Sequence, residues 1–236
     1  MDLEKLQLDY EESLVDYECA LRTVLAELEN VRARMQREYD WPIIANIESR
    51  IKTFDSVVEK CRRKNYENSP KKKIEFDIGT IRVYMQDVVG IRIITDYPDD
   101  IYRVYKTIRK ATNLAITHVD DYIENPKTTG YWGLHLVIQV PVHTEDGTEL
   151  IMVEVQIRDK NIDLWASIDH FVRYKKKHPP EEAEETLLKM ADILREFGTM
   201  SVELRNQILA TKDEDTEDKS TTPNSSNESN TKKPAI

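Results

Sequence analysis

Side chains that could do chemistry alternate with apolar ones along two neighbouring segments, 130–140 and 150–158. Apolar residues recur at every second position in both, a period that indicates strands with one apolar and one polar face. The polar face would carry an imidazole, a carboxylate and a guanidinium, groups that transfer protons and bind anions. The pattern predicts one wall of an active site, formed by His135, Gln139, Glu154, Gln156 and Arg158.

The turn between the two segments sets their register. Asp146–Gly147 is a strong signal for a two-residue hairpin loop. With that loop, Gln139 would lie opposite Glu154 and His135 opposite Arg158, so that the polar residues share one face. A half-exposed hairpin with an ordinary polar surface would alternate in the same way, so the alternation alone leaves both interpretations open.

The elements that must position this wall follow from hydrophobic periodicity and from breaker residues. Together they predict an α+β fold, in which helices flank a mixed or antiparallel sheet. In chain order the predicted elements are a long helix over 3–38, a helix from about Ile44 to Asn65, a strand near Arg82–Met85, a strand at Ile91–Thr95, a helix opened by Pro98, a strand over Ala115–Tyr122, the hairpin, a helix around Ile162–Lys175 and a helix over about Glu181–Ala210.

Composition divides the chain into three parts. Its 236 residues, 39% of them hydrophobic, suffice for one sizeable core. We expect an N-terminal helix in 1–40 for packing or oligomerisation, one domain with a C-terminal helix in 41–210, and a disordered tail in 211–236. The first helix carries a heptad stripe from Leu14 to Met35, which needs an apolar partner in this chain or in another subunit.

Charge and cysteine content narrow the function. The net charge of −10 argues against a general polyanion binder, because an acidic protein repels nucleic acid. Basic residues nevertheless cluster in 50–73, which indicates a compact anionic ligand such as nucleotide phosphate. Cys19 and Cys61 have neither metal-site nor disulfide spacing. Because no signal peptide or membrane-spanning stretch is evident, we expect a cytoplasmic protein without a membrane partner.

Four ordered motifs are the most specific features of the chain. They are D-V-V-G-I-R at 87–92, G-Y-x-x-L-H at 130–135, E-V-Q-I-R at 154–158 and W-A-S-I-D-H at 165–170. In this order they resemble the synthetase domain of the RelA/SpoT family. No other domain is evident, so the chain resembles a small alarmone synthetase, and the hydrolase domain of the family is expected to be missing.

The resemblance implies a nucleotidyltransferase-like core and a pyrophosphokinase activity. ATP would donate its β,γ-pyrophosphate to the 3′-hydroxyl of GDP or GTP, giving AMP and ppGpp or pppGpp, with Mg²⁺ as the cofactor. The resemblance also implies a homo-oligomer, a tetramer, regulated by single-stranded RNA or by alarmone. Arg32 fits a basic position of the regulatory cleft, but Leu25 and Glu29 stand where relatives have lysines, which argues against activation by product.

The resemblance also implies individual roles. Asp87 and Glu154 would bind the metal, and Glu154 would take the proton of the attacking hydroxyl. Arg50 and Arg92 would sandwich adenine, and Tyr131 would stack on guanine. The implied ATP-binding residues are Arg50, Lys52, Ser56, Lys60, Arg63 and Arg92. The implied acceptor-binding residues are Lys127, Tyr131, His135, Gln156 and Ala166.

The G-Y-W-G motif departs from the pattern of the family. Trp132 and Gly133 stand where relatives have Arg or Gln followed by Ser, so we expect fewer contacts to the acceptor phosphates. Two other functions stay open: pyrophosphorylation of an adenosine nucleotide or of the 3′ end of tRNA, and non-catalytic binding of nucleotide or RNA by an oligomer. The pair Asp87 and Glu154 argues against the second, because binding alone needs no metal carboxylates.

Overall fold

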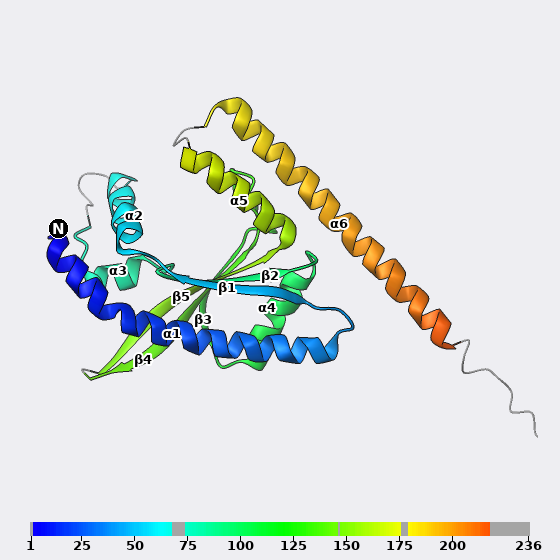
Figure 1. Ribbon diagram of the computed structural model, residues 1–236, viewed down its shortest axis with the longest axis horizontal. Coiled ribbons are helices and arrows are strands. Elements are labelled where there is room, and N and C mark those ends of the chain that lie inside the picture. Colours follow the sequence, from blue (N-terminus) through cyan, green and yellow to red (C-terminus); the bar gives the residue numbers. More distant parts are fainter. Residues whose placement is uncertain (1, 68–73, 146, 176–178, 218–236) are drawn as a thin grey trace, which may run out of the picture.

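The computed structural model describes residues 2–67, 74–145, 147–175 and 179–217 (Figure 1). Its centre is a five-stranded sheet with the strand order β1-β2-β5-β4-β3. Because β2 and β5 run parallel while the other neighbours run antiparallel, the sheet is mixed. The strands are β1 (Ile44–Ile51), β2 (Val89–Thr95), β3 (Ala115–Asp121), β4 (Leu134–Thr144) and β5 (Gly147–Asp159).

Helices lie on both sides of this sheet (Figure 1). Helices α1 and α4 pack together on one face, whereas α5 leaves the end of β5 on the other side and packs against α6. This arrangement confirms the predicted α+β class. The helices are α1 (Leu3–Glu38), α2 (Phe54–Glu67), α3 (Ile78–Tyr84), α4 (Asp100–Ala111), α5 (Lys160–Lys175) and α6 (Glu181–Glu217).

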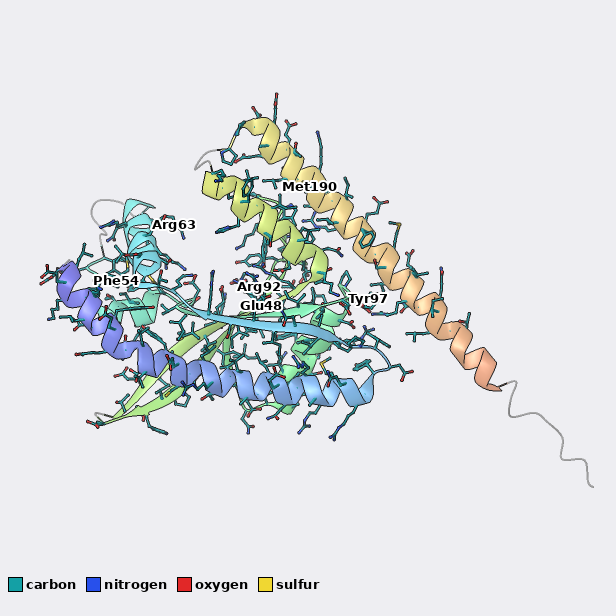
Figure 2. All side chains as sticks on the ribbon, in the orientation of Figure 1. Glu48, Phe54, Arg63, Arg92, Tyr97 and Met190 are labelled. Atoms are coloured by element: carbon teal, nitrogen blue, oxygen red, sulfur yellow. The ribbon has the colours of Figure 1, made fainter. Side chains whose placement is uncertain are left out.

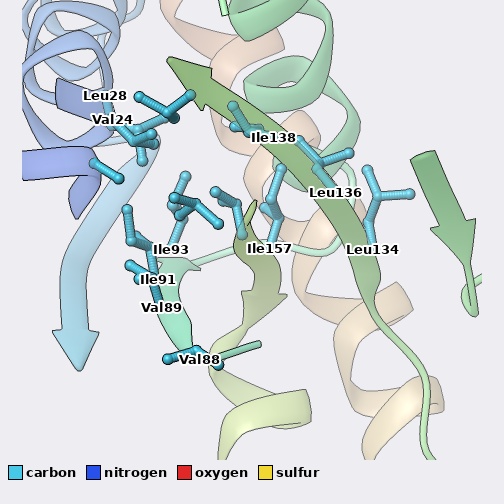
Figure 3. Packing of buried hydrophobic residues seen from close by; sticks show 14 of the residues in the cluster. Val24, Leu28, Val88, Val89, Ile91, Ile93, Leu134, Leu136, Ile138 and Ile157 are labelled. Carbon is cyan, nitrogen blue, oxygen red and sulfur yellow. The ribbon is translucent and has the colours of Figure 1, made fainter. Parts of the chain in front are cut away.

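Helix α1 matches the predicted long helix, and its heptad stripe packs against the sheet of its own chain. Tyr17, Val24, Leu28 and Met35 are at most 1% exposed. Figure 3 shows Val24 and Leu28 facing the aliphatic side chains of the sheet. Of the two partners left open for this stripe, the structure shows the one in its own chain, because the apolar surface of the stripe is buried there.

Leu28→Ala will lower the free energy of unfolding by about 3 kcal/mol, because it removes a fully buried side chain and leaves a cavity. Leu8 lies on the same helix but is 62% exposed, so Leu8→Ala will change stability by less than about 0.5 kcal/mol. Urea unfolding of both variants measures the difference. Equal effects would contradict the packing of the stripe within the chain.

The segment predicted as one helix from Ile44 to Asn65 is instead β1 followed by α2, which begins only at Phe54. Ile44, Ile47 and Ile51 recur with a spacing that fits a helix. Pairing with β2 along the whole of β1 outweighs this local periodicity, since strand formation depends on tertiary neighbours more than on intrinsic preference. Arg50 therefore lies on strand β1 and not on the expected helix.

The strand predicted near Arg82–Met85 is also wrong, because this segment belongs mostly to α3. The helix starts with a capping box. The Asp77 carboxylate accepts from the Thr80 N–H at 2.7 Å, and the Thr80 hydroxyl accepts from the Asp77 N–H at 2.7 Å. Asp is a favoured N-cap residue, but Thr80 stands where the usual sequence signature of a capping box has Glu or Gln, so the signal in the sequence is incomplete.

The hairpin of β4 and β5 has the predicted strands in a different register. Gln139 lies opposite Met152, two residues from the expected partner Glu154. Gly147 already belongs to β5, and Asp146 of the expected turn lies outside the described residues. Because side chains alternate with a period of two, a shift by two residues leaves the polar side chains on one face.

The other predicted elements, β2, α4, β3 and α5, lie close to their predicted ranges. Helix α6 continues to Glu217, past the predicted end at Ala210, and the rest of the predicted tail, 218–236, lies outside the described residues. Among the helices of the described ranges, none combines the length and the hydrophobicity that a membrane crossing requires.

Asp159 ends β5 and begins α5. The side chain is 1% exposed, and its carboxylate accepts from the Ile162 N–H at 2.7 Å. Burial raises the pKa of Asp159 to about 6, although hydrogen bonds from Ile162 and Asn161 act in the opposite direction. At neutral pH the fold therefore carries an ionised carboxylate that burial disfavours.

Asp159→Asn will flatten the pH dependence of the free energy of unfolding. The folded state holds the Asp159 proton more tightly than the unfolded chain does, so the wild-type protein loses stability as pH rises from about 4 to about 6. A shift of about two pKa units corresponds to about 3 kcal/mol. Urea unfolding at several pH values across this window tests the prediction, and parallel curves for wild type and variant would contradict it.

Candidate active site

The polar face of the sheet opens between α2 and α5 into three adjoining cavities. Arg50 borders all three, and both Asp87 and Glu154 line the central one. The two flanking cavities measure about 400 and 620 Å³, within the range of sites for small molecules. Figure 2 shows Arg92 at the sheet and Arg63 on α2, on two sides of this region.

Asp87 lies two residues before the start of β2 and is held between two lysines. Its Oδ2 lies 3.0 Å from Lys52 Nζ, and its Oδ1 lies 2.5 Å from Lys60 Nζ. Lys52 is fixed by its own backbone N–H, which donates to the Val88 carbonyl at 2.9 Å. Burial alone would raise the pKa of Asp87, but the two ammonium groups hold it below its ordinary value. Asp87 is therefore a carboxylate at neutral pH.

Glu154 projects from β5 and is held by side chains on the neighbouring positions of the sheet. Its Oε1 lies 3.3 Å from His135 Nδ1, and Gln156 Nε2 donates to its Oε2 at 2.7 Å. Burial opposes ionisation, yet the contacts with His135 and Gln156 keep the pKa of Glu154 below its ordinary value. Glu154 is thus an oriented, ionised carboxylate that can accept a proton.

The two carboxylates fit a magnesium site that is completed by substrate. They line the same cavity, and the charge of Asp87 opposes ionisation of Glu154, as expected for neighbouring anions. Within the described ranges, no cluster of three or more His, Cys, Asp or Glu side chains is placed to bind a metal. Mg²⁺ is commonly bound by one or two carboxylates together with phosphate oxygens and water, which is what this pair could provide.

One flanking cavity gathers most of the predicted ATP-binding residues. Its basic side chains come from the end of β1 and from α2, so that cations surround a space next to Asp87. Arg92, the remaining predicted member, lines the central cavity together with Arg50. The predicted residues that line the flanking cavity are Arg50, Lys52, Ser56, Lys60 and Arg63.

The other flanking cavity gathers all the predicted acceptor-binding residues, namely Lys127, Tyr131, His135, Gln156 and Ala166. It also contains two cations that the family motifs did not assign. Arg158 belonged to the predicted polar wall, whereas Arg173, near the end of α5, had no signal in the sequence. Gln139, another predicted wall residue, borders none of the three cavities, because it lies further along β4.

Asp163 lies between Arg92 of the central cavity and Arg158 of the acceptor cavity, and the sequence motifs predict no role for it. Its Oδ1 lies 3.1 Å from Arg92 Nη1 and 3.2 Å from Arg158 Nη1. Arg158 in turn donates to Gln156 Oε1 at 2.7 Å, and its guanidinium lies 5.3 Å from the centre of the Tyr131 ring. These contacts fix the cations at the border between the central and the acceptor cavities.

Trp132 faces the core and not the acceptor cavity. It is 5% exposed, its ring centre lies 6.0 Å from that of Trp165, and the Arg195 guanidinium lies 4.7 Å from it. Position 132 therefore does not line the acceptor cavity, to which Arg158 and Arg173 add positive charge. The expectation of fewer contacts to the acceptor phosphates stays a prediction.

The chain resembles known proteins over most of its length. The family model described as the region found in RelA/SpoT proteins matches residues 49–179. The GTP pyrophosphokinase YwaC of Bacillus subtilis is 29% identical, with 88% of this chain and 95% of that protein aligned. GTP pyrophosphokinase YjbM of the same organism is 30% identical, with 84% of this chain and 90% of that protein aligned.

Solved structures give the same result. The crystal structure of small alarmone synthetase 1 from Bacillus subtilis, bound to its product pppGpp, superposes with a TM-score of 0.73 at 28% identity. The match covers 84% of this chain and 97% of that one, so nearly the whole of that structure has a counterpart here.

Proposed function

The chain belongs to the RelA/SpoT family as a small alarmone synthetase, a GTP pyrophosphokinase, and on that premise we propose how its site works. ATP occupies the cation-lined cavity at α2, and GDP or GTP occupies the cavity between β4 and α5. The β,γ-pyrophosphate passes to the 3′-hydroxyl of the acceptor, which yields AMP and ppGpp or pppGpp. The observation that carries this proposal is the position of Asp87 and Glu154 in the cavity between the two.

Glu154 is the base of the reaction. Its carboxylate is ionised and is oriented by His135 and Gln156, so it can accept the proton of the 3′-hydroxyl as the oxygen attacks phosphorus. Lys52 and Lys60, which contact Asp87, can neutralise negative charge on the donor phosphates. This lowers the barrier to transfer between two anions.

Mg²⁺ is the proposed cofactor, with Asp87 and Glu154 as its protein ligands. When bound, the ion would withdraw charge from the pyrophosphate as a Lewis acid. The two lysines on Asp87 hold its carboxylate in place before the nucleotide arrives. Such support of a first ligand by neighbouring groups is common in metal sites.

The bases are bound by flat side chains on either side. Arg50 and Arg92 border the central cavity from two neighbouring strands, which suits a sandwich around adenine. The Tyr131 ring lines the acceptor cavity next to Lys127, whose Nζ lies 5.3 Å from the centre of the ring, and it is the proposed platform for guanine.

Product chromatography after incubation with labelled ATP, Mg²⁺ and each of GMP, GDP, GTP, ADP and uncharged tRNA tests this function. We expect label in a guanosine tetraphosphate or pentaphosphate, with GDP or GTP as acceptor. Label only in an adenosine product or in the 3′ end of tRNA would replace the acceptor. Nucleotide binding without transfer to any of them would make the protein a binding module.

The protein is proposed to work in the cytoplasm as a homo-oligomer, a tetramer. Its subunits would meet through the exposed apolar stripe of α6, since the stripe of α1 is buried. Ile193, Phe197, Met200 and Leu204 are each at least 52% exposed along that helix. Light scattering tests this, because a monomer at micromolar concentration would contradict it, and Ile193→Glu with Leu204→Glu should dissociate the oligomer.

We also propose regulation by alarmone or by single-stranded RNA, although the positive charge available for it on α1 is reduced. Arg32 Nε lies 3.3 Å from the Glu29 carboxylate on α1, so the one basic side chain that fits the regulatory pattern is already paired. Titration of the active enzyme with product and with a short RNA tests it, and an unchanged rate with both would exclude this regulation.

A further inference from the structure

Three side chains form a continuous row that ends at the proposed base. The Tyr131 hydroxyl lies 2.7 Å from His135 Nε2, and the other ring nitrogen, Nδ1, lies 3.3 Å from Glu154 Oε1. Tyr131 and His135 are buried, each 8% exposed, and the Glu154 side chain is 22% exposed. Buried polar groups of this kind take the arrangement in which every donor meets an acceptor.

When His135 is neutral, only one arrangement of protons gives every donor in this row of three side chains an acceptor. If Tyr131 O–H donates to Nε2, the ring carries its proton on Nδ1 and points it at the carboxylate of Glu154. The opposite tautomer would place the Nδ1 lone pair against a carboxylate, which repels it. The carboxylate therefore requires the tautomer with its proton on Nδ1, and the hydroxyl of Tyr131 donates to the Nε2 lone pair that this tautomer would otherwise leave buried and unpaired.

Gly133 makes room for this hydroxyl. It has φ 151°, a backbone conformation that side chains disfavour, and a Cβ built there would lie 2.7 Å from Tyr131 Oη. A carbon and an oxygen cannot approach so closely without one of them moving. In relatives that have Ser at the position of Gly133, the Cβ of the serine would fill this space. The Tyr131 hydroxyl can therefore occupy its position because residue 133 is a glycine.

We propose that Tyr131 is a positioning residue of the transfer reaction, because its hydroxyl holds the His135 ring in the orientation that directs Nδ1 at Glu154. The inference rests on the proposed function and adds to the stacking role of the ring. In the transfer step the 3′-oxygen bonds to the β-phosphorus, the bond from that phosphorus to the AMP oxygen breaks, and the hydroxyl proton passes to Glu154. Tyr131 and His135 keep their protons throughout.

Tyr131→Phe separates the two roles of this residue, because it keeps the ring and removes the hydroxyl. We expect kcat to fall at least tenfold, while KM for the acceptor changes less than threefold. Wild-type kcat in this variant would overturn the proposal.

Tyr122→Phe is the matched control. Its ring centre lies 5.2 Å from that of His135, but the hydroxyl next to His135 Nε2 belongs to Tyr131. This variant also removes one phenolic hydroxyl from a ring that packs against the same imidazole, and it should keep the wild-type kcat. An equal loss in both variants would mean that packing around His135 matters and not the hydrogen bond, which would overturn the proposal.

Nitrogen NMR of the histidine side chains, without nucleotide, tests the row independently of activity. In the wild-type protein His135 should be protonated at Nδ1 and unprotonated at Nε2, and Tyr131→Phe should shift the Nε2 resonance to that of a nitrogen without a hydrogen-bond donor. A wild-type His135 protonated at Nε2 alone would overturn the proposal. A wild-type protein with the expected tautomer but without transfer to any acceptor would instead reject the proposed function.

Discussion

Glu154→Gln will reduce kcat for pyrophosphate transfer at least a thousandfold, which is about 4 kcal/mol of barrier. The amide keeps the shape of the side chain but can neither accept the proton of the 3′-hydroxyl nor bind Mg²⁺ as an anion. The pKa of Glu154 is held low by its contacts, so the wild-type enzyme has the base in its active form at neutral pH. Single-turnover measurement at saturating ATP and acceptor gives the change directly.

ATP binding separates this effect from unfolding of the site. Calorimetry should give a dissociation constant for ATP within a factor of about five of wild type, less than about 1 kcal/mol, because the cations around the donor cavity are unchanged. Glu149→Gln is a matched control on the same strand, since Glu149 pairs with Arg82 away from the site. A Glu154→Gln enzyme with more than a tenth of the wild-type kcat would rule out Glu154 as the base.

Asp87→Asn will also reduce transfer at least a thousandfold, about 4 kcal/mol, but for a different reason. It removes one of two anionic ligands of the proposed metal and leaves Lys52 and Lys60 without the carboxylate that they share. The concentration of Mg²⁺ needed for half of the maximal rate should therefore rise strongly. Glu154→Gln changes the base as well, so only the comparison of both titrations separates metal binding from proton transfer.

Asp55→Asn is the control for Asp87→Asn, because Asp55 is an exposed carboxylate in the first turn of α2. It should leave both the rate and the Mg²⁺ titration unchanged. An Asp87→Asn enzyme with a wild-type Mg²⁺ titration would show that Asp87 serves only to hold the two lysines, and the metal would then need another ligand.

Sequence patterns predicted most of the framework but failed where tertiary pairing decides. The apolar periodicity of 3–38 gave α1 with its bounds, and the alternation around Glu154 gave the polar face of the hairpin. The isoleucines after Ile44 have a spacing that predicts a helix, whereas hydrogen bonding to β2 makes this segment a strand. The register of the hairpin was wrong by two residues because it was inferred from a turn signal alone.

The site shows the same division. Ordered motifs identified the residues that gather around Asp87, since residue types at fixed spacing carry that information. They could not show that Trp132 turns into the core, because this depends on its packing against Trp165. Nor could they show the hydrogen bond between Tyr131 and His135, for which the missing Cβ of Gly133 leaves room.

The most direct measurement follows the two ends of ATP in one reaction. The purified protein is incubated with GDP, Mg²⁺ and ATP labelled either at the α-phosphorus or at the γ-phosphorus. We predict that the α-label appears in AMP and the γ-label in guanosine tetraphosphate, in equal amounts, and that Glu154→Gln abolishes both. Release of ADP or of free phosphate, with no label in the guanosine product, would contradict pyrophosphate transfer.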